Sequence, residues 1–544
     1  MLQRPTSYET EGVIKSEAAS TMASWLAQIQ KSSDLGSDVW TLLALVVGVA
    51  LLHKVFFGRK KLRLPPGPRG WPVLGNLPIL GTMPHLSITE LSKKYGPLMS
   101  IRLGSASAVV ISSPEMAKVF FRTQDHIFAN RPFTINGQVF MYNFQDVSFS
   151  PYNEHWRFLR KVIDMEIFSN KRLRHLKDFR GEEILASIER MLEEGRGGNP
   201  VDMKKSMAQL SVEHICRICF NNNYSQWKSK SCHSNGVPKT LASMLDEWIA
   251  ISGAFFVGEY IPYLRKLDLG GFEAQLLRLR SDFEQFLNPI IEEHRKNEGR
   301  SDKDFLDVLL SLQRENQDGF PNDRVKALIN NVLIAGTQTT SDQTTWALTE
   351  LMRHPDIKQK VVDELDLVVG RERLVEESDI GNLVYLKAVV KETLRMYPSV
   401  PLGVPHEAME DTQVAGHDIP KKTRVLFNAY GIGRDPKLWE DPTTFNPERF
   451  INSPIDVKGH HFELLSFGAG RRQCPGMDMG LLLVQVTVAQ ILHTCHLSVP
   501  AGVVVDVEEG IGITLPKANP LMVLISPRLE PQFYIQKGIK VNFS

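Results

Sequence analysis

The ten residues from Phe467 to Gly476 constrain this chain more than any other segment. They lead directly into Met477–His493, a strongly apolar stretch that predicts a buried helix. Cys474 therefore lies at a helix start, where free backbone N–H groups stabilise a negative charge. Pro475 suits the first helical position, because its missing N–H costs nothing there. The segment predicts a cysteine that is held as a thiolate.

The glycines and an arginine of this loop suit a flat, anionic partner. Gly468, Gly470 and Gly476 let the backbone pass close to a planar group, because they carry no side chain. The guanidinium of Arg472 can form a bidentate pair with a carboxylate. A soft thiolate is a strong axial donor to haem iron, so Cys474 is the candidate metal ligand.

Two other interpretations of the loop fit less well. A lone cysteine at a turn is more often a buried structural residue, but the ten-residue context argues against that interpretation. A dinucleotide-binding loop would need a third glycine where Gln473 stands, and no strand-turn-helix unit surrounds the segment.

The loop resembles the signature of a known superfamily. Phe467, Gly470, Arg472, Cys474 and Gly476 match the F-x-x-G-x-R-x-C-x-G pattern of the cytochrome P-450 superfamily. The resemblance covers residues 60–527 and is closest to plant-type microsomal members. It implies a mainly α-helical fold with small β-sheets, preceded by one N-terminal transmembrane helix. It also implies haem b bound through the loop, and electrons from NADPH through a separate reductase.

Other motifs of that superfamily follow in order. Glu392 and Arg395 match its E-x-x-R pair, and Arg449 matches the third member of the same structural triad. The resemblance implies that these three residues lock the core around the haem. Trp156 and Arg160 match the W-x-x-x-R pair, whose i,i+4 spacing puts both on one helix face.

The same resemblance assigns propionate contacts. The indole N–H of Trp156 and the guanidinium of Arg160 are expected to reach the haem propionates. His406, which follows Pro405, is similar to a further propionate contact of the superfamily.

The segment Leu328–Met352 is expected to be the helix beside bound oxygen. Its centre, AGTQTT from Ala335 to Thr340, resembles the superfamily motif A/G-G-x-D/E-T-T/S. The resemblance implies that Gly336 leaves room over the haem and that Thr339 hydrogen-bonds oxygen. The alternative is a threonine-rich helix that merely packs.

Gln338 departs from that motif, because it stands where the superfamily has an acid. An amide cannot deliver a proton by ionising. The proton route is therefore expected to run through water or through Asp342, one helical turn later. The departure also keeps a non-oxygenating reaction open.

The implied activity is an NADPH-reductase-dependent monooxygenation that inserts one atom of O2 into a hydrophobic small molecule. The segment Tyr142–Asp146 is similar to that of flavonoid and phenylpropanoid ring hydroxylases, which favours a phenolic substrate of plant specialised metabolism. The alternatives are a terpenoid hydroxylase, an oxime-forming N-hydroxylase and a haem-thiolate isomerase or dehydratase. Thr339 argues against a non-enzymatic haem carrier. The segments expected to line the mostly apolar substrate pocket are Gln124–Asn143, Ala254–Val257, Asn331–Thr339, Ser399–Val404 and Ile511–Thr514.

Residues 39–57 predict a transmembrane anchor. The stretch spans roughly 28 Å at about 1.5 Å per residue, close to the ~30 Å hydrocarbon core of a bilayer. Basic residues follow it, so the positive-inside rule places the C-terminal side in the cytosol. We expect a lumenal segment over 1–38, a basic and Pro-rich hinge over 58–72 and a haem-thiolate catalytic domain over 73–544. The protein is then a single-pass protein of the endoplasmic reticulum membrane with lipid as a partner. A cleaved signal peptide and a core helix are the alternatives.

The composition argues against a nucleic-acid-binding protein and against a disulfide-rich one. The chain has 63 basic and 62 acidic residues, and a net charge of +1 gives no hint of a nucleic-acid partner. Five cysteines in 544 residues argue against a disulfide framework. Cys216 and Cys219, with His214 and the Cys232–His233 pair nearby, could suggest zinc, but their spacing fits no standard finger and predicts packing residues.

Overall fold

The structure is a computed structural model, and some parts of the chain lie outside its description. The described residues are 62–221, 232–234, 237–253, 256–297, 303–315 and 320–536, with Leu43, Leu45, Val46 and Gly48. The predicted lumenal segment and membrane anchor fall outside them, apart from those four residues. Among the described residues one helix, Met477–Thr494, is long and apolar enough to cross a bilayer, and 67% of it is buried in the protein.

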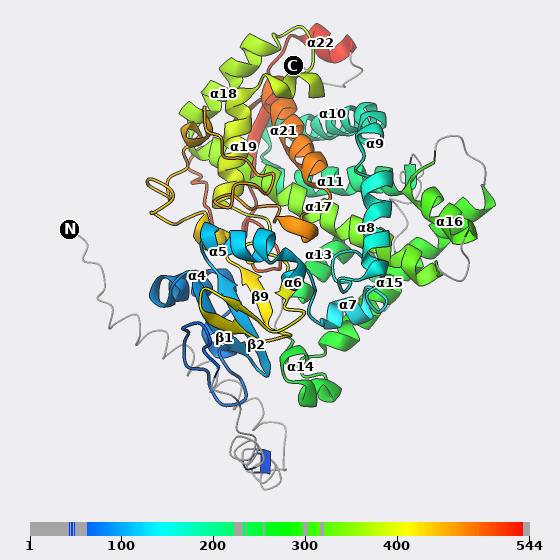
Figure 1. Cartoon of the computed structure of the whole chain (residues 1–544). Helices are drawn as coiled ribbons and strands as arrows, with labels where there is room; N and C mark the ends of the chain where they lie inside the picture. The colour runs from blue at the N-terminus through cyan, green and yellow to red at the C-terminus, as the bar shows by residue number, and fades with distance from the viewer. Residues whose placement is uncertain are drawn as a thin grey trace, which may run out of the picture.

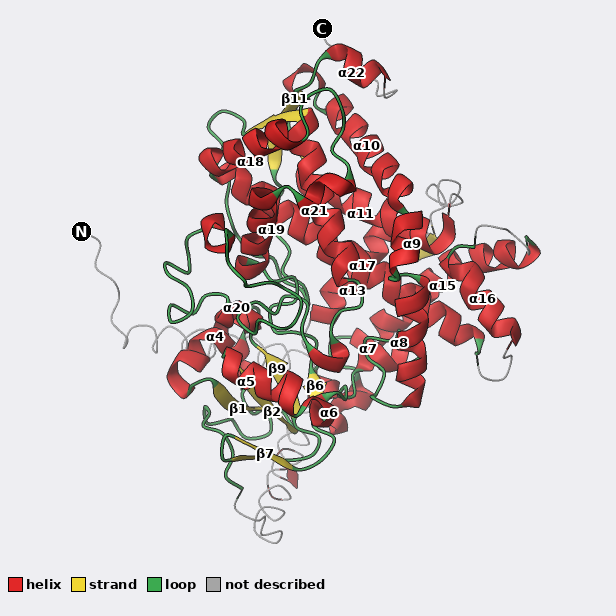
Figure 2. Ribbon diagram, turned by 45° about the horizontal axis from the view of Figure 1, so that its top comes forward, coloured by secondary structure: helices red, strands yellow, loops and turns green. Residues whose placement is uncertain are grey.

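Helices build most of the described chain, as their periodicity predicts (Figure 1; Figure 2). The longer ones are α4 (Pro84–Tyr95), α8 (Glu154–Glu166), α10 (Lys177–Glu194), α11 (Met203–Phe220), α13 (Leu241–Gly253), α15 (Phe272–Lys296), α16 (Phe305–Glu315), α17 (Asn322–Arg353), α18 (Pro355–Val368), α19 (Val384–Met396) and α21 (Met477–Thr494). The shorter helical segments are α3 (Leu77–Leu80), α5 (Pro114–Lys118), η1 (Val119–Thr123), α6 (Asp125–Phe128), α7 (Ile135–Val139), α9 (Asn170–His175), η2 (Arg196–Gly198), α14 (Val257–Tyr260), η4 (Pro262–Leu267), η5 (Glu377–Gly381), α20 (Ala429–Ile432), η6 (Pro447–Phe450), η7 (Gly470–Arg472) and α22 (Pro531–Gln536).

A four-stranded sheet lies at the lower left of the molecule in Figure 1, beside α4 and α5. Apolar and polar residues alternate over Leu98–Ser113, which predicts a β-hairpin, and strands β1 (Leu98–Leu103) and β2 (Ala106–Ile111) form it. The segment Thr423–Phe427 predicts a short strand, and β9 (Arg424–Phe427) is that strand. β9 pairs in parallel with β2, and β6 (His406–Glu407) closes the order β1-β2-β9-β6.

Smaller ladders complete the strand set. A three-stranded sheet has the order β10-β11-β3, and two hairpins pair β4 with β5 and β7 with β8. Their bounds are β3 (Val201–Asp202), β4 (Cys232–Ser234), β5 (Val237–Lys239), β7 (Thr412–Val414), β8 (His417–Ile419), β10 (Cys495–Ser498) and β11 (Met522–Pro527).

The structure corrects two expectations about local structure. The sequence of Phe533–Val541 predicts a short strand, which is wrong for residues 533–536 because Pro531–Gln536 is helical; residues 537–541 lie outside the described residues. Tyr534 lies in this helix, and its buried hydroxyl accepts hydrogen bonds from the backbone N–H groups of Arg528 and Leu529, at 3.0 and 3.1 Å. The sequence of Cys232–Pro238 predicts a loop, but its described residues belong to strands β4 and β5.

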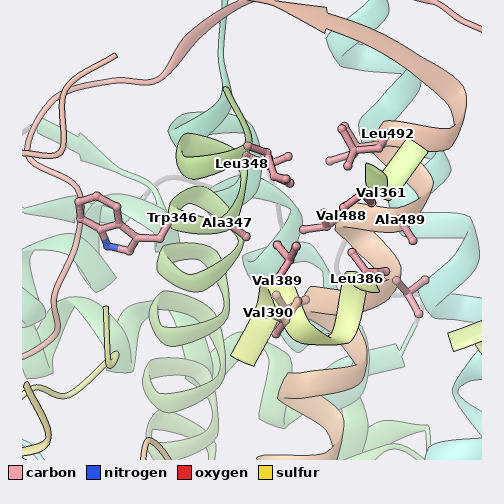
Figure 3. Packing of buried hydrophobic residues seen from close by; sticks show 14 of the residues in the cluster. Trp346, Ala347, Leu348, Val361, Leu386, Val389, Val390, Val488, Ala489 and Leu492 are labelled. Carbon is pink, nitrogen blue, oxygen red and sulfur yellow. The ribbon is translucent and has the colours of Figure 1, made fainter. Parts of the chain in front are cut away.

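The largest core cluster packs around α17. Figure 3 shows Trp346, Ala347 and Leu348 of α17 beside residues of α18, α19 and α21. Burying such side chains stabilises the fold by about 25 cal/mol for each Å² removed from water. The cluster fixes α17 against α21, and so places the AGTQTT segment relative to the helix that begins after Cys474. The partners labelled in Figure 3 are Val361, Leu386, Val389, Val390, Val488, Ala489 and Leu492.

Candidate active site

The cysteine loop is closed by its own backbone. The N–H of Cys474 donates to the carbonyl of Phe467 at 3.0 Å, and α21 begins three residues later with Gly476 as its N-cap. Gly470 has φ of +68°, and a Cβ there would lie 2.5 Å from both Asp125 Oδ1 and the Phe121 carbonyl. The loop thus needs a glycine at this position for both conformation and space.

The sulfur of Cys474 is solvent-accessible although it lies deep among protein atoms. Both properties hold together when an atom borders an internal space. Burial raises the pKa of this thiol, while the N–H of Gly476 and the charge of Arg160 act to lower it. Cys474 is thus an exposed residue whose sulfur has an N–H donor and a cation beside it, as a metal-ligating thiolate requires.

Arg472 is buried and makes three hydrogen bonds to backbone carbonyls. It donates to Ala129 at 2.7 Å, Val147 at 3.1 Å and Ser150 at 2.6 Å. Its guanidinium carbon lies 4.3 Å from the ring centre of Trp156. Burial, helped by the neighbouring Arg131, lowers the pKa of Arg472 to about 8.

Arg131 is a second buried cation of this region, which the sequence interpretation missed. It donates to the carbonyls of Val404 and Pro405 at 2.7 and 2.9 Å, and burial lowers its pKa to about 9. The only hint in the sequence is a lone basic residue within the largely apolar run 127–140. Asp146 lies near both arginines, and burial raises the pKa of its carboxyl to about 6. Two buried cations beside a single acid leave an excess of positive charge, which favours further carboxylates at this place.

The Trp156 indole and the Arg160 guanidinium both hold backbone near Cys474. The indole N–H donates to the Val147 carbonyl at 3.1 Å, which also accepts from Arg472. Arg160 donates to the Gln473 carbonyl at 2.6 Å and to Asp164 at 2.8 Å, which fixes the residue before Cys474. These bonds brace the loop, and the propionate contacts expected of both residues stay a prediction.

His406 lies within hydrogen-bond distance of the Phe128 carbonyl, 2.8 Å from its Nδ1. A carbonyl accepts only, so Nδ1 carries the proton. Burial, together with Arg131 and Arg472, lowers the pKa of His406 well below its usual range, and the ring is neutral. It can donate through Nε2 only if an anion placed beside it raises that pKa.

Thr339 and Ala335 lie one turn apart on α17. The hydroxyl of Thr339 donates to the Ala335 carbonyl at 2.7 Å, and the helix continues unbroken. Ala335 is exposed although most of the helix is buried, so this face of α17 borders open space.

Gly336 lies where α17 approaches α11, and its expected place over the haem stays a prediction. A Cβ at Gly336 would lie 2.5 Å from Cδ1 of Ile215, so this glycine allows α11 and α17 to approach closely. The residue that faces open space is its neighbour Ala335. Helical spacing of about 100° per residue accounts for the difference between the two faces.

Gln338 and Asp342 form one hydrogen-bonded pair. Gln338 Nε2 donates to Asp342 Oδ1 at 2.9 Å, while Oδ2 of the same carboxyl is buried without a hydrogen bond to the described part of the chain. Burial raises the pKa of Asp342 to about 7, although Gln338, the nearby Thr514 hydroxyl and Lys204 act to lower it. The pair therefore offers a buried acid that is half-protonated near neutral pH.

The structure brings the three residues of the expected triad together. Arg395 makes two hydrogen bonds of 2.7 Å to the two carboxylate oxygens of Glu392. Arg449 donates to Glu392 Oε1 at 3.2 Å, and the N–H of Asn446 donates to the same oxygen at 2.8 Å. Glu392 and Arg395 are fully buried, and such a pair depends strongly on both partners.

One contact joins two segments that were expected to line the substrate pocket, Ser399–Val404 and Asn331–Thr339, and two others join an expected segment to a residue just outside one, Ser148 or Gly253. Asn331 Nδ2 donates to Ser148 Oγ at 2.7 Å, and the Ser399 hydroxyl donates to the Thr339 carbonyl at 3.5 Å. A Cβ at Gly253 would lie 2.6 Å from Cα of Gly512. Residues 254 and 255 of the predicted Ala254–Val257 segment lie outside the described residues.

The zinc alternative is not supported. Cys216 and Cys219 are fully buried in α11, within an apolar cluster, as packing residues are. Among the described residues, the group close enough to hold an ion consists of His294, Asp304 and Asp307, and it includes neither cysteine.

Comparison with known proteins settles the family. The family model described as Cytochrome P450 matches residues 65–524. The chain belongs to the cytochrome P450 family. A flavonoid 3'-monooxygenase of Crocosmia x crocosmiiflora is 41% identical, with 87% of this chain and 94% of that protein covered. A flavonoid 3'-monooxygenase of Arabidopsis thaliana is 38% identical, with 89% and 96% covered.

A solved structure agrees with the fold. A zebra fish cytochrome P450 with abiraterone matches at a TM-score of 0.69 and 28% identity, covering 83% of this chain and all of that one. The described mainly helical fold with small sheets is thus the P450 fold. This P450 is a haem-thiolate monooxygenase, and its residues fit the haem that the family carries. An exposed cysteine lies at a helix start, and two buried arginines that share one acid, Asp146, suit the propionates.

Proposed function

We propose that this P450 hydroxylates a flavonoid, with O2 as co-substrate and NADPH as the electron source through a separate reductase. The reaction class rests on the accessible sulfur of Cys474 at the start of α21. The substrate class rests on the relatives, which are flavonoid 3'-monooxygenases and 3',5'-hydroxylases, 36–41% identical over most of the chain.

Haem, when bound, supplies a reducible iron at which oxygen is activated. Cys474 would hold the iron, and its thiolate is stabilised by the Gly476 N–H and by Arg160. Arg472 and Arg131 would neutralise the propionates with buried charges. Phe467, Gly470 and Gly476 shape the loop, whereas Trp156 and Arg160 brace it.

Thr339 and the Gln338–Asp342 pair would manage protons. The Thr339 hydroxyl is held by the Ala335 carbonyl on the face that borders open space, so it is placed to hydrogen-bond there. Gln338 cannot ionise, but its amide donates to a carboxyl with a pKa of about 7. Asp342 would store the proton that the motif's usual acid would otherwise provide, and water beside Gln338 would carry it to Thr339.

The substrate would bind beside Ala335. Asn331 lies one turn before Ala335 on α17, so the Asn331–Ser148 bond lies on the same side of the helix. These groups would give a planar phenolic compound a few polar contacts in a mostly apolar setting.

Membrane and redox partners complete the proposal. Residues 39–57 would anchor the protein in the endoplasmic reticulum, with 1–38 lumenal, 58–72 as a hinge and 73–544 as the cytosolic catalytic domain. The reductase would dock on α8, where Arg157 and Lys161 are exposed and Arg160 contacts the cysteine loop.

Two experiments test the proposal. The reduced protein with carbon monoxide should show the red-shifted Soret band of thiolate ligation, and Cys474→Ser should lose it. A Cys474→Ser protein that kept the band would overturn the assignment. Reconstitution with NADPH, reductase and a panel of flavonoids should yield hydroxylated products, whereas products formed without NADPH would favour an isomerase or dehydratase.

A further inference from the structure

Three consecutive residues between α7 and α8 have left-handed backbone. Tyr142, Asn143 and Phe144 have φ values of +49°, +58° and +63°. None of them is glycine, and a left-handed conformation costs an L-residue about 1–2 kcal/mol. A run of this kind persists only where the surrounding structure holds it.

The backbone of this turn is satisfied by α7 and its continuation. The N–H groups of Asn143 and Phe144 donate to the carbonyls of Gln138 and Gly137, each at 2.8 Å. The ring of Phe144 lies against Gly137, where any Cβ would overlap it. These bonds close the turn but do not tie it to the rest of the fold.

Tyr142 provides that tie through its side chain. The ring is buried, and its hydroxyl donates to Glu284 Oε1 of α15 at 2.8 Å. The guanidinium carbon of Arg280, also on α15, lies 3.9 Å from the ring centre. Arg280 donates to Glu284 at 3.2 Å, and Lys326 of α17 lies 3.7 Å from the same carboxylate.

The chain that follows the turn forms part of the candidate site. Ser148 accepts from Asn331 on the Ala335 side of α17, and its carbonyl accepts from Arg131 at 3.0 Å. Val147 provides the carbonyl shared by Arg472 and Trp156. Because these groups follow the turn by only a few residues, a displacement of the turn would move them.

We infer that Tyr142 is a positioning residue for the substrate: its bond to Glu284 holds the left-handed turn and thereby the wall formed by residues 145–148. The inference rests on the proposed function, because it assumes that the substrate binds beside Ala335. Tyr142 itself touches neither reacting atoms nor cofactor in this account.

The test compares flavonoid binding by the holoenzyme, measured as the substrate-induced Soret shift, in wild type and Tyr142→Phe. The phenylalanine keeps the ring under Arg280 and loses the hydroxyl that donates to a charged group. For Tyr142→Phe we expect a roughly tenfold larger dissociation constant and a raised KM. Its kcat should change far less, and its carbon monoxide spectrum should be unaltered. Tyr263→Phe, at a tyrosine that is 91% exposed, is the matched control and should bind as wild type does.

Two further variants separate the effect of the Tyr142–Glu284 hydrogen bond, called the clamp below, from a general loss of structure. Asn143→Ala leaves the clamp intact but raises the cost of the turn at an exposed position, and should weaken binding in the same direction. Glu284→Gln keeps an acceptor for the hydroxyl but removes the charge, so it should weaken binding less than Tyr142→Phe does, and to the level that wild type reaches in acid.

The pH dependence adds a readout that simple packing would not change. Burial acts to raise the pKa of Glu284, but Tyr142, Arg280 and Lys326 outweigh it and lower that pKa; Asp323 of α17 also lies near Tyr142. Wild-type affinity should fall as Glu284 is protonated in acid, and Glu284→Gln should not show that step. Equal affinity in Tyr142→Phe and wild type would overturn the inference. A wild type that binds no flavonoid would instead overturn the proposed function.

Discussion

Gln338 donates a 2.9 Å hydrogen bond to Asp342 one turn along α17. An amide in the position of the motif's acid is thus joined to a buried carboxyl with a raised pKa of about 7. The acid therefore lies one turn beyond the motif position, and Gln338, which directly precedes Thr339, is hydrogen-bonded to it.

Removing the displaced acid should uncouple the enzyme. Asp342→Asn should lower the fraction of NADPH electrons recovered in product by about tenfold, since a positioned proton donor contributes at least that much. Gln338→Asp should raise this fraction, because it places an acid in the motif position. Product and hydrogen peroxide are measured against NADPH consumed.

Asp363→Asn is the matched control for that experiment. Gln359 and Asp363 form the same i,i+4 pair at 2.8 Å on the exposed side of α18. This variant should couple normally. Full coupling in Asp342→Asn would rule out Asp342 as the proton store.

Asp342 should also make stability depend on pH. Its pKa is near 3.8 when unfolded and about 7 when folded, so the folded state binds the proton more tightly. The stabilisation is complete below the unfolded pKa and is lost as pH rises toward 7, by up to about 4 kcal/mol. Asp342→Asn removes this loss of stability. The unfolding temperature of the variant should therefore rise relative to that of wild type as the pH increases from 5 to 8. A constant difference over that range would contradict the assigned pKa.

Arg131 should hold haem as strongly as Arg472 does. Arg131→Gln removes a buried cation and the donors to Val404 and Pro405, so haem transfer to an acceptor apoprotein should be about tenfold faster. Arg157→Gln, at an exposed arginine of α8, is the control and should transfer haem at the wild-type rate. Unchanged transfer from the Arg131 variant would place the propionates elsewhere.

Two glycines of the cysteine loop provide a matched pair. Gly468 and Gly470 have φ of +69° and +68°, but only at Gly470 would a Cβ meet other atoms. Gly468→Ala should cost about 1 kcal/mol from strain alone. Gly470→Ala should cost more and lower the haem-loaded fraction in the carbon monoxide spectrum. Equal losses in both variants would show that space at Gly470 does not matter.

Much of this arrangement follows from local pattern. The alternation over Leu98–Ser113 predicted the β1–β2 hairpin, and the apolar run after Cys474 predicted α21. The triad residues Glu392, Arg395 and Arg449 were expected to act together, and the structure joins them. These predictions succeed because they rest on the spacing of residues within one helix or strand, or on a short sequence motif.

Other features of the site depend on contacts between distant elements. Gly336 contacts Ile215 because of how α11 crosses α17, which helical spacing does not specify. Trp156 donates to Val147 because the backbone between α7 and α8 returns to it. Tyr534 lies in a helix because its hydroxyl binds Arg528 and Leu529, whereas its neighbours alone suggest a strand.

The central claim is that this P450 inserts one atom of O2 into a flavonoid. The direct measurement is turnover of a flavonoid by the full-length protein with reductase and NADPH under 18O2, followed by mass spectrometry. The account predicts a hydroxylated flavonoid carrying one 18O atom, formed only with NADPH and abolished in Cys474→Ser. A product without 18O, or one formed equally by Cys474→Ser, would contradict it.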